Sequence, residues 1–368
     1  MSQRLANVLK FACFLAIGAG ILALVYRSQS AAYAEQCALD GVPAAECSLL
    51  GKLAADLATV DYRWLLALLA IFMVSNFFRA ARWVQLIEPL GRRVRFGNAF
   101  WSVMIGYFAN LGLPRAGEVV RAGILGRYEG VAVERVMGTV VVDRILDVLC
   151  LLAVVAVAFV LQWETLSSFV VDARGGDASA TGADWHVYLA AGLASLLVGV
   201  ALAGWAYRRF AHLALVRKLA GVVTGFADGL RSAGRVERKG VLALHTAGIW
   251  GCYFAMAYLP FFAFPPTAHL GADAALMVFV FSALGIVIPS PGGMGSYHLM
   301  VIQALALYDV SGADALSFAN ILFFTVNLGC NIVFGLLGLA VLPALNGGRE
   351  VGLAGSAAPA PTTGADPA

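Results

Sequence analysis

Charge is scarce in this chain. Only 13% of its 368 residues are charged, whereas about 25% is usual in a globular domain. Hydrophobic residues make up 61%, and the mean hydropathy is +0.82. A soluble protein of this length cannot bury so much apolar side chain, because its surface must still contact water. The composition excludes a soluble globular domain and predicts an all-α integral membrane protein that crosses the bilayer several times.

Lysine, histidine and cysteine are also scarce, and each shortage narrows the function. The basic residues are 21 Arg and only 4 Lys, and the net charge is +3, so no basic face predicts binding to nucleic acid. His and Cys never occur at metal-ligand spacing, so we expect no metal site and no cofactor. Arginine holds phosphate or carboxylate through two parallel hydrogen bonds. The arginine bias therefore favours an anionic ligand.

Six apolar runs are long enough to span a hydrocarbon core, which needs about 20 residues of α-helix. They lie at about residues 9–27, 63–88, 136–162, 186–207, 240–263 and 316–343. Two further apolar regions, 97–128 and 272–308, are interrupted by proline and glycine. A kink or a surface turn is one interpretation, but irregular backbone inside a bilayer survives only where protein or a water-filled cavity satisfies it. We predict six to seven full spans and two broken, re-entrant helical pairs.

Loop charges predict the orientation. Residues 28–62 hold five acids and one base, whereas residues 79–95 hold five arginines and one acid. Basic loops stay in the cytoplasm, so we expect a cytoplasmic N-terminus and an outside loop at 28–62. This loop contains Cys37 and Cys47, for which a disulfide and two unpaired thiols are both open.

Three segments are expected on this basis. They are an N-terminal transmembrane anchor with its extracytoplasmic loop (1–62), a transmembrane domain (63–345) and a C-terminal tail (346–368). The tail is rich in Ala, Gly, Pro and Thr, a composition that predicts disorder.

The two broken regions occupy equivalent places along the chain. Pro114 lies 51 residues after the start of the span at 63, and Pro291 lies 51 residues after the start of the span at 240. The predicted orientation makes these two spans run in opposite directions. This arrangement is typical of transporters built from inverted repeats. The halves share no clear sequence identity, so the repeat stays open at this point.

The first break carries three charged side chains within seven residues: Arg115, Glu118 and Arg121. Charges inside a membrane segment are costly, so they line a pathway or pair with one another. Arg115 and Glu118 could simply neutralise each other. A single acid cannot neutralise two arginines, however, and the surplus guanidinium suits an anionic headgroup.

A second cluster, Asp143, Arg144 and Asp147, lies early in the span at 136–162. The two aspartates are four residues apart and share a helix face. One interpretation is an internal network that locks this helix to its neighbours, and the other places Arg144 in the cavity beside Arg115. Arg79 and Arg82 are expected to extend to the cytoplasmic interface and meet lipid phosphate there.

The second break is nearly uncharged. It contains Gly292, Gly293 and Gly295, which permit close backbone approach or positive φ angles. His298 follows the break, either as a hydrogen-bonded packing residue or as a proton-relay group.

At these motifs the chain resembles the lysylphosphatidylglycerol synthase transmembrane-region family. The first signature comprises Asn110, Pro114 to Glu118, Arg121, Asp143, Arg144 and Asp147, and the second comprises Pro289 to Gly295. The resemblance covers roughly residues 60–345. It implies a flippase-like protein of the bacterial cytoplasmic membrane that moves an anionic phospholipid or a modified lipid between leaflets.

Two departures from the family pattern bear on function. His298 stands where the family often has an acid, so any role of that acid does not carry over. The chain ends about 25 residues after its last predicted span, so we expect neither an aminoacyl-transferase domain nor lipid aminoacylation.

We therefore predict a lipid translocase or lipid-transport factor rather than an enzyme. Arg115, Arg121 and Arg144 would receive the headgroup of a membrane phospholipid or lipid-linked substrate. Glu118, Asp143 and Asp147 would orient the arginines, and the turn at 292–295 would close the other side.

Two rivals remain. One is a scaffold or regulator of a lipid- or glycan-modifying partner enzyme, in which the membrane charges are purely structural. The other is a polyprenyl-linked glycosyltransferase, which needs a catalytic carboxylate beside a sugar-nucleotide or metal site, and the sequence shows no such cluster. A homo-oligomer is also open.

Overall fold

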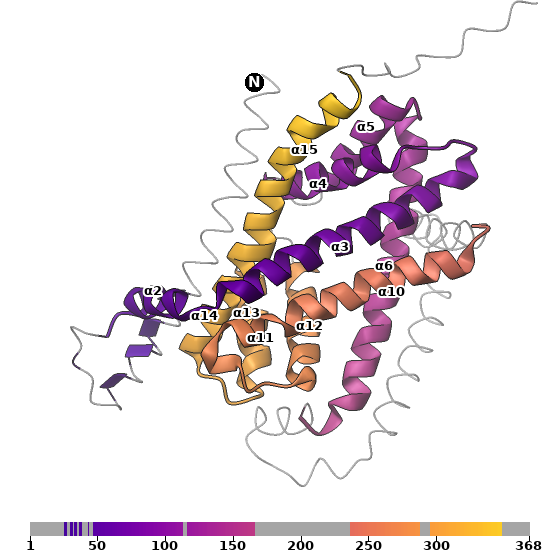
Figure 1. Cartoon of the computed structure of the whole chain (residues 1–368). Coiled ribbons are helices and arrows are strands. Elements are labelled where there is room, and N and C mark those ends of the chain that lie inside the picture. The colour runs from indigo at the N-terminus through magenta and orange to yellow at the C-terminus, as the bar shows by residue number, and fades with distance from the viewer. Residues whose placement is uncertain are drawn as a thin grey trace, which may run out of the picture.

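A computed structural model of the chain describes residues 48–112, 116–165, 236–287 and 295–347, with scattered positions between 26 and 47. Every regular element in these ranges is a helix, which confirms the all-α fold class (Figure 1). The predicted spans at about 9–27 and 186–207, and the predicted tail, lie outside the described residues apart from a few at their edges.

The helices of the first half are α2 (Leu49–Thr59), α3 (Tyr62–Ile87), the short η1 (Glu88–Leu90), α4 (Phe96–Gly112), α5 (Ala116–Glu129) and α6 (Val133–Leu161). Those of the second half are α10 (Lys239–Tyr258), α11 (Pro260–Ala263), η3 (Pro265–Thr267), α12 (Ala272–Val287), α13 (Ser296–Ala306), α14 (Gly312–Leu322), the π-helix η5 (Phe323–Cys330) and α15 (Asn331–Leu345).

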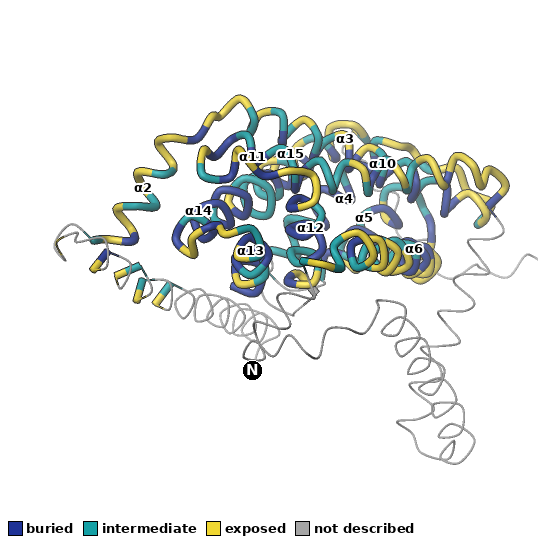
Figure 2. The backbone as a smooth tube through the Cα atoms, turned by 90° about the horizontal axis from the view of Figure 1, so that it is seen from below, coloured by how far each residue is buried: buried dark blue, intermediate teal, exposed yellow. Residues whose placement is uncertain are grey.

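Within the described ranges, four helical segments are long and apolar enough to cross a membrane. They are Tyr62–Leu90, Val133–Leu161, Lys239–Ala263 and Gly312–Leu345. These segments coincide with four of the six predicted spans, which are therefore confirmed as helices. Large apolar side chains such as Leu152 and Leu161 of α6 remain exposed, as lipid-facing residues would be. Figure 2 shows exposed positions along α6 and buried ones where α12, α13 and α14 pack together.

The first broken region forms a hairpin of α4 and α5. At its closed end the backbones touch, because a Cβ on Gly106 would lie 2.9 Å from the carbonyl oxygen of Gly117. The Gly117 N–H also donates to Asn110 Oδ1 at 2.7 Å. At the open end Asn98 Nδ2 donates to Glu129 Oε1 at 2.6 Å. The prediction of two half-helices is confirmed, and both outer ends of the hairpin lie together.

The second broken region repeats this construction in α12 and α13. A Cβ on Gly285 would lie 2.9 Å from the carbonyl oxygen of Ser296, and the Ser296 hydroxyl donates to the Gly285 carbonyl at 2.8 Å. In each pair, a glycine of the first half-helix admits the backbone of the second. That either pair re-enters from one side of a membrane stays a prediction.

Packing between the two halves follows the pattern of an inverted repeat. The helices α3 and α10 are antiparallel: the Asp61 N–H donates to the Ala263 carbonyl at one end, and Gln85 Nε2 donates to the Arg238 carbonyl at the other. The hairpin of the first half, α4–α5, packs on α15 of the second half. The hairpin of the second half, α12–α13, packs on α6 of the first half. Units related by a two-fold axis exchange contacts in this way.

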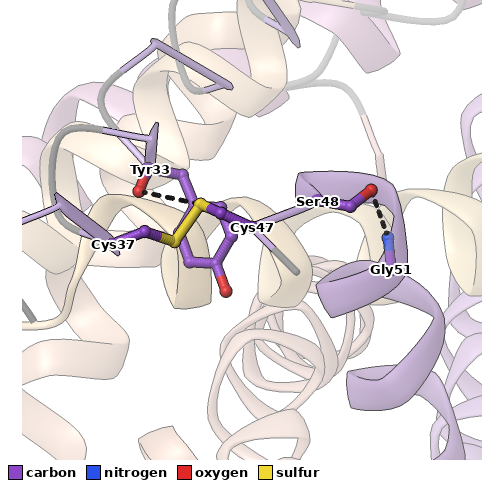
Figure 3. Close-up of a disulfide and its surroundings, with 5 residues drawn as sticks. All are labelled: Tyr33, Cys37, Cys47, Ser48 and Gly51. Carbon is purple, nitrogen blue, oxygen red and sulfur yellow. Dashed lines mark hydrogen bonds between the residues drawn. A yellow bond between two sulfur atoms is a disulfide. The ribbon is translucent and has the colours of Figure 1, made fainter. Parts of the chain in front are cut away.

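The segment before α3 contains a disulfide and is joined to α14 by an ion pair. Cys37 and Cys47 form a disulfide, which settles the choice left open by the sequence (Figure 3). Lys52 of α2 pairs with Asp56 at 2.9 Å and with Asp314 of α14 at 2.7 Å. Burial lowers the pKa of Lys52, but the hydrogen bonds to the two aspartates outweigh it and leave the pKa raised.

Candidate functional site

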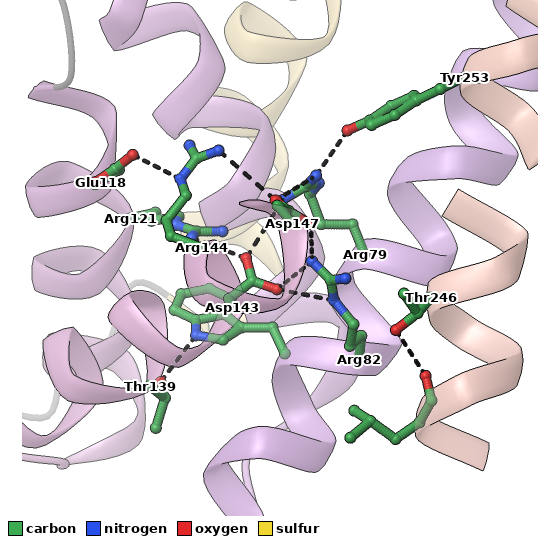
Figure 4. A network of polar contacts seen from close by, with 12 residues as sticks. Arg79, Arg82, Glu118, Arg121, Thr139, Asp143, Arg144, Asp147, Thr246 and Tyr253 are labelled. Carbon is green, nitrogen blue, oxygen red and sulfur yellow. Dashed lines mark hydrogen bonds and ion pairs between the residues drawn. The ribbon is translucent and has the colours of Figure 1, made fainter. Parts of the chain in front are cut away.

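Two arginines of α3 and two aspartates of α6 form a buried ion-pair network (Figure 4). Arg82 Nε donates to Asp143 Oδ1 at 2.9 Å, and Arg82 Nη2 approaches Asp147 Oδ1 at 2.5 Å. Arg79 Nη1 donates to Asp143 at 3.3 Å and to Asp147 at 3.1 Å. Arg79 Nη2 donates to the Tyr253 hydroxyl at 2.7 Å. The network joins α3 and α6 and reaches α10.

The hairpin helix α5 joins the same network through Arg121. Its Nη2 donates to Asp143 Oδ2 at 3.1 Å, and its guanidinium lies 4.9 Å from the ring centroid of Trp83. Trp83 in turn donates from its indole nitrogen to Thr139 Oγ1 at 3.0 Å. Asp143 therefore accepts from three guanidinium groups on α3 and α5. These ion pairs match the interpretation in which the cluster holds α6 to its neighbours, but the partners of Asp143 are arginines of those neighbouring helices.

The prediction that Arg79 and Arg82 extend to the cytoplasmic interface is wrong. Their side chains are 3% and 0% exposed, and both are turned to α6. Asp143 lies ten residues beyond Val133, or about 15 Å along the axis of α6. Asp143 and Asp147, at this distance from the start of α6, give the two guanidinium groups buried partners. Sequence alone does not show that α6 packs on α3.

A more open ion pair joins α5 to α6. Arg144 Nε lies 2.7 Å from Glu118 Oε1, and the two side chains are 39% and 26% exposed. A second approach, from Arg144 Nη1 to Asp147 Oδ2, is longer at 3.8 Å. The pair borders a small surface hollow between the hairpin and α6. The hollow is lined in part by Tyr107, Asn110, Gly117, Glu118, Arg121 and Arg144.

The described network is cationic. Its four guanidinium groups (Arg79, Arg82, Arg121 and Arg144) face three carboxylates (Glu118, Asp143 and Asp147), which leaves one positive charge in surplus. The most exposed of the four is Arg144, at the hollow. An anion that enters the hollow would therefore meet an accessible guanidinium backed by fixed positive charge.

The other predicted site residues divide into two groups. Arg115, Gly292 and Gly293 lie outside the described residues. Gly295 precedes α13 with φ at 83°, a left-handed conformation that glycine adopts without strain. His298 is fully buried, with Nε2 3.1 Å from Asn320 Oδ1 of α14. These contacts match the packing interpretation of His298 rather than a place in the arginine-lined hollow.

Sequence reasoning missed Arg79, Arg82 and Tyr253 as members of the site. The available signal was the spacing of the two arginines, which lie three residues apart on one helix face, while the two aspartates of α6 lie four apart on one face of their helix. In the described ranges, no group of three His, Cys, Asp or Glu side chains is placed to hold a metal ion.

One known protein family matches the part of the chain that forms this site. The family model described as the lysylphosphatidylglycerol synthase transmembrane region matches residues 48–335. The chain belongs to this family. The match contains both hairpins. It also contains all four described membrane-crossing segments, apart from the last residues of α15. Membership and the apolar helices together make the chain a multi-pass membrane protein of a lipid-related family.

A named relative extends the comparison. The glycosyltransferase AglD of Haloferax volcanii is 27% identical over 311 residues. The matched region is 76% of this chain and 49% of that protein, so the chain spans about half the length of the relative. No solved structure matches this chain.

Proposed function

We propose that this protein receives the anionic headgroup of a membrane lipid in the hollow beside Arg144 and moves the lipid between leaflets. The observation that carries the proposal is a partly exposed guanidinium among apolar helices, in a network with one positive charge in surplus. Charge is costly at such a place and usually marks a substrate pathway. The substrate would be a phospholipid or a lipid-linked compound, because phosphate oxygens accept paired hydrogen bonds from guanidinium.

The network assigns different tasks to its members. Arg144 would contact the headgroup, and Arg121 would support it from the wall of the hollow. Asp143 and Asp147 hold the arginines of α3 and so fix the position of α6 against α3, and Asp143 also holds Arg121 of the hairpin. Arg115 lies outside the described residues and stays a predicted member of the site.

The proposal is tested by the lipids that the purified protein retains, measured by native mass spectrometry. Arg144→Gln removes the accessible charge, whereas Arg135→Gln removes an exposed charge from the first turn of the same helix. We expect wild type and Arg135→Gln to retain one class of anionic lipid and a folded Arg144→Gln to lose it. Identical lipid profiles for all three proteins would favour the scaffold alternative, in which the network only holds helices together.

The name of the relative favours a second candidate, a part in glycosyl transfer. A glycosyltransferase needs a carboxylate free to act as a base, but the three acids of this network are paired with arginines. Incubation of the purified protein with membrane lipids and radiolabelled sugar nucleotides separates the two functions. Label transferred to lipid would replace the transport proposal with catalysis.

A further inference from the structure

The ion pairs beside the hollow differ in how easily they can open. Arg82 and Asp143 are fully buried, so a break between them would leave charges inside the protein. Arg144 and Glu118 are 39% and 26% exposed, so water can reach both groups when they separate. The Arg144–Glu118 pair is therefore the one that an incoming ligand can open at low cost.

The Glu118 carboxylate occupies a place suited to an anion. It lies in the first turn of α5, where the helix dipole favours negative charge. Arg121, three residues further on, lines the same hollow with its side chain 5% exposed. Its buried Nε has no hydrogen-bond acceptor among the described residues. Guanidinium groups bind carboxylate and phosphate in the same geometry, so a phosphate could take the place of Glu118.

On the basis of the proposed function, we infer that Glu118 is an internal substitute for the headgroup. The phosphate of the lipid displaces its carboxylate from Arg144, and Glu118 pairs with Arg144 again when the lipid leaves. The surplus charge of the network equals the single negative charge of a phosphodiester. Competition from Glu118 weakens binding, and a transport pathway needs sites weak enough to release what they bind.

The test compares Glu118→Gln with Glu134→Gln, an exposed acid in the first turn of α6. Each variant is placed in phosphatidylcholine vesicles that contain phosphatidylglycerol. Retained phosphatidylglycerol and its rate of movement between leaflets are both measured. In Glu118→Gln the charged carboxylate no longer competes with the lipid for Arg144. Because the Glu118–Arg144 pair is partly exposed, we expect about threefold to tenfold more retained lipid for this variant. Its translocation should slow because release is slower, while Glu134→Gln should match wild type.

The outcomes separate this inference from the proposed function. If Glu118→Gln retains the same or less lipid while Arg144→Gln loses it, the headgroup site stands and displacement by the headgroup is wrong. If Arg144→Gln also matches wild type, the proposed function itself fails.

Two further arms complete the design. If Glu118→Gln does not fold, Glu118→Asp keeps the charge on a shorter side chain and should raise retention in the same direction; no rise overturns the inference. If inorganic phosphate stabilises the protein and phosphatidylglycerol is not retained, the site binds free phosphate and the lipid inference is overturned.

Discussion

Asp143→Asn should be the most destabilising single change in the network. Asp143 is fully buried and accepts from Arg79, Arg82 and Arg121. An amide offers one oxygen in place of two, and its NH₂ group faces a guanidinium that can only donate. Removal of one partner from a buried ion pair costs about 3–5 kcal/mol. Asp147 still pairs with both arginines of α3, so we expect a loss near about 3 kcal/mol.

The free energy of unfolding in mixed micelles measures this effect. Glu134→Gln, which removes an exposed acid from the same helix, should change it by less than about 0.5 kcal/mol. Adding Arg121→Gln to Asp143→Asn removes a guanidinium that has lost its carboxylate. The double variant should therefore be less destabilised than the sum of the single variants, by about 1–3 kcal/mol. A loss below about 1 kcal/mol for Asp143→Asn, with additive single effects, would refute the claim that this carboxylate joins three helices.

Three other changes test separate parts of the structure. Gly117→Ala places a Cβ against the carbonyl oxygen of Gly106, so thermal unfolding should show a loss of about 1–3 kcal/mol; Gly123→Ala, where no atom lies within 4 Å, should not. The raised pKa of Lys52 means that its pairing is complete below its ordinary pKa and is lost as pH rises through the raised value. The protection factors of the α2 amides, which are exchange rates corrected for the intrinsic pH dependence of amide exchange, should therefore be constant between about pH 6 and pH 9 and fall only above about pH 10. Protection factors that already fall near neutral pH would contradict this. Tyr253→Phe removes one hydrogen bond to a buried guanidinium and should cost about 1–3 kcal/mol in the same unfolding assay without loss of retained lipid, whereas lost lipid would move α10 into the site.

Much of the helical framework can be predicted from the sequence, because each signal for it is local. Apolar runs near 63–88 and 240–263 are long enough to fix spans, and prolines and glycines interrupt the apolar region that follows each of them. The charges of α5 and α6 also stand out as candidates, because ionisable residues are rare in such segments.

Contacts between distant segments are not local and could not be predicted in the same way. Whether Arg79 points to an interface or into the protein depends on which face of α6 packs against α3. The π-helix at Phe323–Cys330 interrupts what reads in sequence as one continuous span. For His298, sequence left two interpretations, and the buried contact with Asn320 of α14 matches the packing interpretation.

We propose that the partly exposed guanidinium of Arg144 serves lipid movement. It is tested most directly by the translocation of fluorescent phosphatidylglycerol in proteoliposomes that contain wild type, Arg144→Gln or Arg135→Gln. Wild type and Arg135→Gln should move the lipid faster than protein-free vesicles do, and Arg144→Gln should fall to the protein-free rate. Equal rates for Arg144→Gln and wild type, with both proteins folded, would contradict it.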